Sequence, residues 1–103
     1  MAKMSKAEIA ASLEGLVGWE LGGKTIVKGY EFPSFPEAMR FVNNVAGLAE
    51  AADHHPDILI NYRKVTLTLS THDEGGLTKK DFELASQIEK ERKSFKAAGN
   101  KVF

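Results

Sequence analysis

The chain has 103 residues, with 14 basic and 14 acidic side chains, three histidines and no cysteine. A chain of this length is expected to form one domain over residues 1–103, and its high surface-to-volume ratio favours association with copies of itself. The balanced charge argues against a nucleic-acid binder that depends on a positive field. The absence of cysteine excludes disulfides, thiolate nucleophiles and cysteine-based zinc sites, which leaves histidine and carboxylate chemistry.

The N-terminal residues predict neither a signal peptide nor a membrane span. Residues 1–13 include Lys3, Lys6 and Glu8, and they contain no apolar run of sufficient length for either purpose. We therefore expect a cytoplasmic protein without a membrane partner.

The first third of the chain predicts a helix followed by a hairpin. The segment Ser5-Lys-Ala-Glu8 has the pattern of a capping box, and apolar residues recur after it at helical spacing. The first helix is therefore expected from about Lys6 to Gly15. The Gly22-Gly23 pair predicts a turn between strands at residues 19–21 and 25–32.

The middle of the chain predicts a long helix and a second hairpin. Residues 34–37 form another capping-box pattern, and the apolar positions of residues 38–52 predict an amphipathic helix of about four turns. Apolar and polar residues then alternate in two segments, 58–62 and 65–69, as in strands with one buried face. Arg63-Lys64 is the predicted turn between them.

A third helix is predicted after a glycine-containing loop. Glu74-Gly75-Gly76 interrupts the strand pattern, and Thr78-Lys-Lys-Asp81 has the features of a helix start with an acidic first turn. The pattern of residues 97–103 is weakly specified. The predicted fold class is α+β, in the order α-β-β-α-β-β-α, with a four-stranded antiparallel sheet and helices on one face. The core face of the third helix is expected to hold Phe82, Ala85, Ile88 and Phe95.

All three histidines belong to one constellation of titratable groups. Imidazoles titrate near neutral pH, so their concentration beside carboxylates is typical of a proton-transfer site. The residue before a proline is biased away from helix, which places His55 in the crossing from helix to strand. A tight hairpin would bring the start of its first strand beside the end of its second. The members are Glu50, Asp53, His54, His55, Pro56, Tyr62, Thr71, His72 and Asp81.

Each of these residues also has a structural interpretation that the sequence leaves open. A loop histidine is often a surface residue, Asp53 has the position of a helix end, and Asp81 has that of a helix cap. Trp19 could pack in the core rather than against a ligand. Three histidines also suggest catalytic zinc, but adjacent side chains such as His54 and His55 rarely converge on one metal, so no metal is expected.

The spacing of the constellation resembles the signature of the pterin-4a-carbinolamine dehydratases. The signature reads Glu50-x-x-x-His54-His55-Pro56, then five residues, Tyr62, nine residues, His72, eight residues and Asp81. Further resemblances are Gly18-Trp19, Tyr30-x-Phe32-x-x-Phe35, Leu69-Ser-Thr-His72 and Gly76-Leu77, so that the likeness extends from Ser5 to Phe95. A signature with this many fixed spacings is far more specific than a single motif.

The resemblance implies a reaction and a substrate class. Members of the family dehydrate a tetrahydropterin that carries a hydroxyl at C4a, a by-product of aromatic amino acid hydroxylases, to a quinonoid dihydropterin. The resemblance therefore implies a functional link to such a hydroxylase. Imidazoles can supply and remove the two protons of this step, so no metal or organic cofactor is expected.

The resemblance also implies roles for individual residues. His54 and His72 are expected to act as acid and base on either side of C4a, while His55 holds and polarises the pterin. Glu50 and Asp53 would orient the imidazoles, and Asp81 would fix its loop. The remaining substrate contacts would be Pro56, Thr71, Asp73, Glu74 and Trp19.

The chain departs from the family pattern at two places. Lys80 stands where some relatives have arginine, and the hairpin at residues 19–26 is shorter than in some relatives.

Two alternative functions remain open. They are a non-catalytic pterin-binding protein and a protein-binding module, because animal members of the family also act as dimerisation cofactors of a transcription factor. Exposed sheet edges and the family resemblance together predict a homo-oligomer, either a dimer or a tetramer.

Overall fold

The computed structural model describes residues 2–102, with side chains placed for residues 2–93. The observed order of elements confirms the predicted α-β-β-α-β-β-α arrangement, with one short 3₁₀ helix added before the last helix. The elements are α1 (Lys6–Glu14), β1 (Glu20–Gly22), β2 (Thr25–Glu31), α2 (Phe35–Ala52), β3 (Asp57–Asn61), β4 (Lys64–Leu69), η1 (His72–Glu74) and α3 (Lys79–Val102).

The strands form one antiparallel sheet in the order β1-β2-β4-β3. The alternation read from residues 65–69 is confirmed, because Val65, Leu67 and Leu69 are fully buried while Thr66 and Thr68 on the opposite face are half-buried. β1 and β3 are the two outer strands of this sheet. The second hairpin, β3 and β4, therefore lies at one edge.

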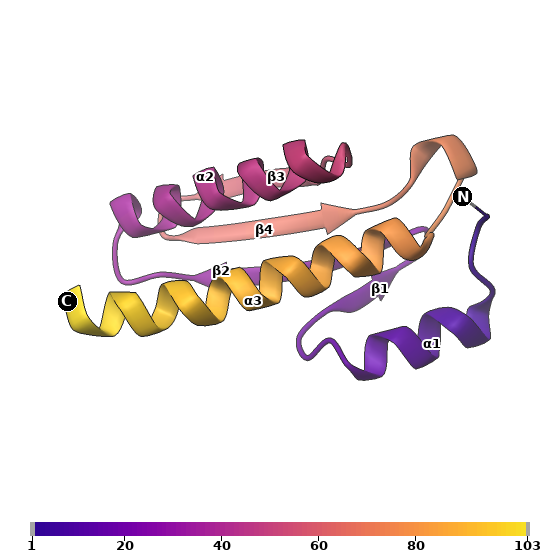
Figure 1. The fold of residues 1–103 in the computed structure, drawn as a ribbon, viewed down its shortest axis with the longest axis horizontal. Coiled ribbons are helices and arrows are strands. Elements are labelled where there is room, and N and C mark those ends of the chain that lie inside the picture. The colour runs from indigo at the N-terminus through magenta and orange to yellow at the C-terminus, as the bar shows by residue number, and fades with distance from the viewer. Residues whose placement is uncertain (1, 103) are drawn as a thin grey trace.

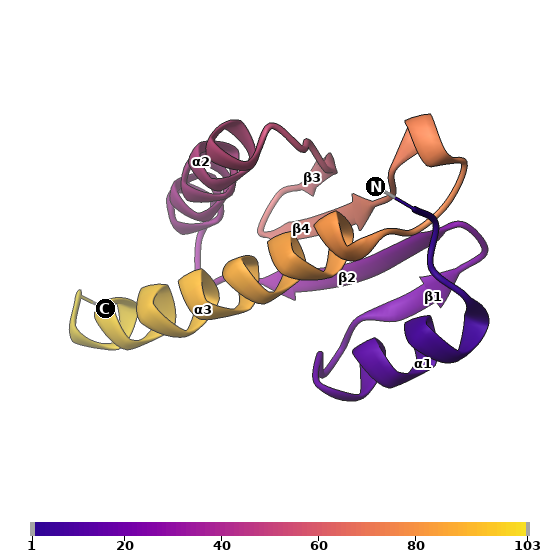
Figure 2. The same ribbon diagram turned by 45° about the vertical axis from the view of Figure 1, so that its right-hand side comes forward.

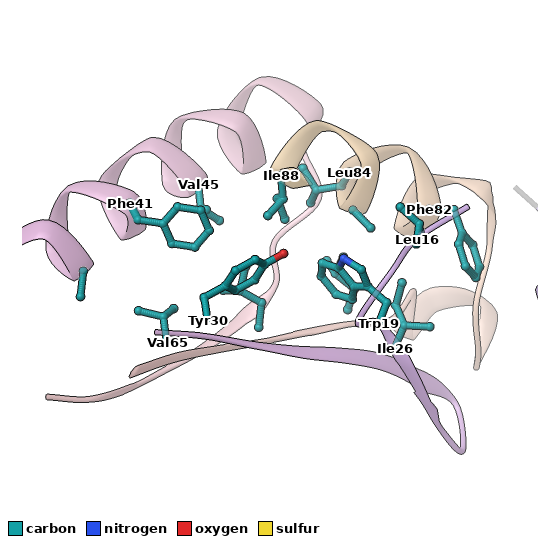
Figure 3. Packing of buried hydrophobic residues seen from close by; sticks show 14 of the residues in the cluster. Leu16, Trp19, Ile26, Tyr30, Phe41, Val45, Val65, Phe82, Leu84 and Ile88 are labelled. Atoms are coloured by element: carbon teal, nitrogen blue, oxygen red, sulfur yellow. The ribbon is translucent and has the colours of Figure 1, made fainter. Parts of the chain in front are cut away.

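Helices α2 and α3 cover one face of the sheet, and α1 lies alongside β1 (Figures 1 and 2). Figure 3 shows the resulting core, in which side chains from both long helices point toward side chains of the sheet. Phe41 and Val45 of α2 and Ile88 of α3 are completely buried there. Ile9 and Leu13 of α1 pack against the same core, so the prediction of helices on one face is confirmed. Among residues 2–102, no helix has the length and apolar character to cross a bilayer.

The predicted turn of the second hairpin is wrong by one residue. The turn of the second hairpin is Tyr62-Arg63, because Asn61 pairs with Lys64 and leaves only two residues between the strands. Tyr62 has a φ of 54°, as the first position of a tight hairpin turn requires when the strands have their normal twist. The last helix continues to Val102, whereas residues 97–103 had no clear pattern. The prediction for Phe95 concerns a side chain outside the described part.

Candidate active site

The end of α2 positions the first two histidines. The helix ends at Ala52, and Asp53 adopts the left-handed conformation, with φ 51° and ψ 44°. The Asp53 N–H donates to the carbonyls of Ala49 and Glu50, and the His54 N–H donates to the Ala49 carbonyl at 3.1 Å. This reversal of the backbone ends the helix. It also directs the chain through His54 toward β3.

The left-handed residue at the end of α2 gives a stability prediction. A residue with a Cβ pays about 1–2 kcal/mol in this conformation, while glycine adopts it freely and aspartate tolerates it through local hydrogen bonding. We expect Asp53→Ala to be less stable than Asp53→Gly by about 1 kcal/mol, measured by urea unfolding at neutral pH. Equal stability of the two variants would mean that the reversal at Asp53 has no energetic consequence.

The second hairpin brings the histidine segments together, as its topology predicted. Asp57 of β3 pairs with Thr68 of β4, so the residues before β3 lie beside those after β4. An open cleft of about 310 Å³ is formed where they meet. It is lined by Asp53, His54, His55, Ser70, Thr71, His72, Asp73 and Lys80.

A buried carboxylate supports His54. The Nε2 atom of His54 lies 2.6 Å from Oδ1 of Asp81, and the exposed fractions of the two side chains are 10% and 0%. The other oxygen of Asp81 accepts hydrogen bonds from the Thr71 hydroxyl at 2.8 Å and from the Thr78 N–H at 3.0 Å. Asp81 therefore caps α3, as predicted, and also holds the His54 ring in place.

His55 has an exposed carboxylate partner instead. Its Nε2 atom lies 2.5 Å from Oε2 of Glu50, and both side chains are more than half exposed. Glu50 thus lies beside an imidazole, as the sequence suggested, but it contacts His55. The orienting partner of His54 is Asp81, whereas the sequence interpretation assigned orientation to Glu50 and Asp53. Adjacent histidines therefore have separate partners.

The third histidine faces the cleft from the opposite segment. His72 is the first residue of η1 and is exposed. Thr71, which precedes it, is buried and pairs with Gly76, so that the loop closes on itself. Within residues 2–102, the structure contains no group of three or more histidine or acidic residues arranged to hold a metal ion.

The cleft differs in part from the predicted set of site residues. Ser70 and Lys80 line it although sequence reasoning assigned neither of them to the site. Their positions next to Thr71 and Asp81 were the available signal. Pro56 and Glu74 belong to the converging segments but are not among the lining residues. Tyr62 occupies the turn at the far end of the hairpin, where its ring stacks on that of Phe35 with the ring centroids 6.5 Å apart.

Trp19 lies in the core rather than in the cleft, which corrects its predicted contact with substrate. It is 5% exposed, and its indole N–H donates to Oε2 of Glu89 at 3.0 Å. The same oxygen accepts hydrogen bonds from Lys28, at 2.8 Å, and from the Tyr30 hydroxyl. Figure 3 shows the indole nitrogen and the tyrosine oxygen pointing toward the helix layer. Of the two roles that the sequence left open for Trp19, packing in the core is therefore the one observed.

This cluster around Glu89 predicts a loss of stability at alkaline pH. Burial, followed by the hydrogen bond to Glu89, raises the pKa of Tyr30 far above its usual value. The folded state therefore retains a proton that the unfolded chain releases near pH 10, so the stabilisation is complete below pH 10 and is lost as the pH rises further. We expect the unfolding free energy, from urea titrations, to fall as the pH rises above about 10. The unfolding free energy of Tyr30→Phe should fall less steeply over the same pH range. An identical slope would contradict the assignment of this pH dependence to Tyr30.

A second, larger cleft lies between α1 and α3, and its lining lacks the imidazoles of the first. Its volume is about 530 Å³, and its lining includes Met4, Leu16 and Phe82 together with Glu8 and Lys79. No histidine is among its described lining residues. All three histidines of the chain lie instead at the smaller cleft.

Comparisons with known proteins agree on one family. The family model described as Pterin 4 alpha carbinolamine dehydratase matches residues 2–91. A protein of Roseiflexus sp. (strain RS-1), whose assignment as a pterin-4-alpha-carbinolamine dehydratase is provisional, is 60% identical over 87 residues, which are 84% of this chain and 94% of that protein.

Solved structures show the same fold. The crystal structure of a transcriptional coactivator/pterin dehydratase from Brucella melitensis has a TM-score of 0.83 at 32% identity and covers 86% of this chain and 97% of that chain. A pterin dehydratase-like protein identified as a RuBisCO assembly factor in the alpha-carboxysome has a TM-score of 0.61 at 22% identity. The match covers 72% of this chain and 88% of that chain. The second likeness concerns the fold alone.

Proposed function

Because the chain belongs to the pterin-4-alpha-carbinolamine dehydratase family, we propose that it converts a 4a-hydroxytetrahydropterin to a quinonoid dihydropterin and water. The observation that supports this proposal most directly is the meeting of His54, His55 and His72 at one cleft. Two of these imidazoles have carboxylate partners at hydrogen-bond distance, and such partners fix the orientation of a ring.

The reaction needs two proton transfers and no redox partner. The C4a–O bond breaks as the lone pair of N5 forms a double bond to C4a, and the departing hydroxyl takes a proton to leave as water. The proton on N5 passes to a base, so atoms and charge balance. General acid–base catalysis by imidazoles suits both transfers at neutral pH. We therefore propose no metal or organic cofactor, and the pterin is the substrate.

The proposed division of roles follows the surroundings of each histidine. His54 is nearly buried and backed by Asp81, while His72 lies across the cleft on the other segment. These two would exchange protons with the hydroxyl and with N5. His55, which is exposed and paired with Glu50, would hold the pterin ring. Further substrate contacts would come from Pro56, Asp73 and Glu74.

The test is dehydration of a carbinolamine generated in place by an aromatic amino acid hydroxylase. We expect the purified protein to accelerate the absorbance change that marks loss of the 4a-hydroxytetrahydropterin, above the uncatalysed rate. A protein that binds a tetrahydropterin without accelerating this step would be a non-catalytic pterin-binding protein, and the proposal would be wrong. A positive result would also support a cytoplasmic role in regenerating the hydroxylase's tetrahydropterin.

We also propose that the chain forms a homo-oligomer. β3 is an outer strand with Leu59 more than half exposed, and antiparallel pairing of two such strands would join two sheets. Light scattering should give at least twice the chain mass of 11.3 kDa, or four times that mass for a tetramer. Leu59→Lys should shift the mass toward that of the single chain. A wild-type mass of one chain would exclude the oligomer.

A further inference from the structure

A chain of hydrogen bonds lies beneath the cleft and ends at His54. It begins at the backbone N–H of Lys80, which donates to Oγ1 of Thr78 at 3.3 Å. The Thr78 and Thr71 hydroxyl oxygens lie 2.8 Å apart, and the Thr71 hydroxyl lies 2.8 Å from Oδ2 of Asp81. Thr71, Thr78 and Asp81 are all buried, so bulk water does not compete for these bonds.

Counting hydrogens fixes the direction of this chain. Each threonine hydroxyl has one hydrogen to donate. An ionised Asp81 only accepts, so the hydrogen of Thr71 must point to Oδ2 of Asp81. The contact between the two threonines then requires that the hydrogen of Thr78 point to Oγ1 of Thr71. Every hydroxyl hydrogen is used once, and Thr78 still accepts from the Lys80 N–H.

The hydrogen bonds around Asp81 are those of a side chain that acts as an acceptor. Its Oδ2 atom accepts from the Thr71 hydroxyl and from the Thr78 N–H. A carboxylate oxygen has two lone pairs, so these two donors use the accepting capacity of Oδ2. Asp81 also lies in the first turn of α3, where the helix dipole favours a negative side chain. A carboxylate held in this way presents Oδ1 to His54 as an acceptor.

We propose that this relay holds His54 in the tautomer protonated at Nε2, and that Thr71 and Thr78 are positioning residues that act through Asp81. The Nε2–H donates to Asp81 across the 2.6 Å contact. Nδ1 is then the nitrogen that exchanges a proton with the ligand. This assignment of Nδ1 rests on the proposed dehydratase function, whereas the tautomer itself does not.

The tautomer can be measured directly on the folded, ligand-free protein. Long-range ¹H–¹⁵N NMR spectra distinguish a protonated from an unprotonated ring nitrogen, and His54→Gln identifies the signals of His54 by their loss. At a pH where His54 is neutral, we expect its Nε2 to be protonated and its Nδ1 to be unprotonated. A His54 ring protonated at Nδ1 alone would overturn the proposal.

Variants of Thr71 test whether the relay sets the tautomer. Thr71→Val removes the hydroxyl at nearly constant volume, and Thr71→Ser retains it. We expect Thr71→Val to mix the two tautomers of His54 and to lower kcat by about tenfold, as loss of an outer partner of a functional histidine does, with a smaller change in KM. Thr71→Ser should keep the wild-type tautomer of His54 and the wild-type kcat. Thr66→Val, a matched change on the far face of β4, should change neither.

Folding and function are separated by the same experiments. Circular dichroism identifies any variant that fails to fold, and the wild-type spectrum then still decides the tautomer. A folded Thr71→Val protein with an unchanged tautomer and unchanged kcat would refute the relay. Nε2 protonation in a protein that dehydrates no carbinolamine would refute the proposed function and leave the tautomer assignment standing.

Discussion

Replacing His54 with alanine should lower kcat/KM for carbinolamine dehydration by about 10²- to 10⁴-fold, the range that general acid–base groups contribute. The His54 ring lies at the cleft, and its Nε2 atom is hydrogen-bonded to the buried carboxylate of Asp81. Alanine removes the imidazole that we propose transfers the proton, while the rest of the cleft stays in place. Initial rates in the hydroxylase-coupled assay, corrected for the uncatalysed step, give the measurement.

Two further variants make the His54 result specific. His55→Ala removes the exposed histidine with the Glu50 partner, and we expect it to raise KM more than it lowers kcat, as loss of a binding contact does. His54→Ala also leaves Oδ1 of buried Asp81 without this partner, so its unfolding by urea must be measured alongside. A folded His54→Ala protein with kcat/KM within twofold of wild type would remove His54 from the mechanism.

Local patterns predicted the architecture of the site because short-range rules determine it. The capping box at Ser5 is confirmed, because Ser5 Oγ accepts from the Glu8 N–H at 3.2 Å and the Glu8 side chain accepts from the Ser5 N–H at 2.8 Å. At Ser34 the N-cap is confirmed, because Ser34 Oγ accepts from the Glu37 N–H at 3.3 Å. Strand alternation and a short turn were sufficient to place His54 and His72 at one cleft. The predicted turn was one residue too late, because the register depends on pairing across the sheet.

Long-range side-chain partners could not be predicted in the same way. The pair between His54 and Asp81 joins residues 27 positions apart, and it forms because η1 and the following loop bring the start of α3 beneath the cleft. The bond between Trp19 and Glu89 spans 70 positions. No periodicity or cap records such a pairing, so the sequence could suggest that Asp81 lies near this corner without identifying the histidine it supports.

Replacing Glu89 with alanine should lower the unfolding free energy by about 3 kcal/mol, the largest stability effect that we expect from a single polar side chain. One oxygen of Glu89 accepts from Trp19, Lys28 and Tyr30. These donors come from the first hairpin and the segment before it, so Glu89 ties that hairpin to α3. Alanine would leave a buried indole N–H, a buried hydroxyl and a half-buried ammonium without this acceptor. Glu83→Ala, an exposed change on the same helix, should stay within about 0.5 kcal/mol of wild type.

The effect of Glu89 should also depend on pH in a defined direction. Burial alone would raise the pKa of Glu89, but hydrogen bonds from Lys28, Tyr30 and Trp19 outweigh it and hold the pKa below its usual value. The charge therefore stabilises the fold above the unfolded pKa of about 4.3, and this contribution is lost as the pH falls through the lower folded pKa. Urea unfolding of wild type and Glu89→Gln should differ fully at pH 7 and less at pH 3. If the difference were the same at both pH values, the packing of the side chain, rather than its charge, would hold the hairpin to α3.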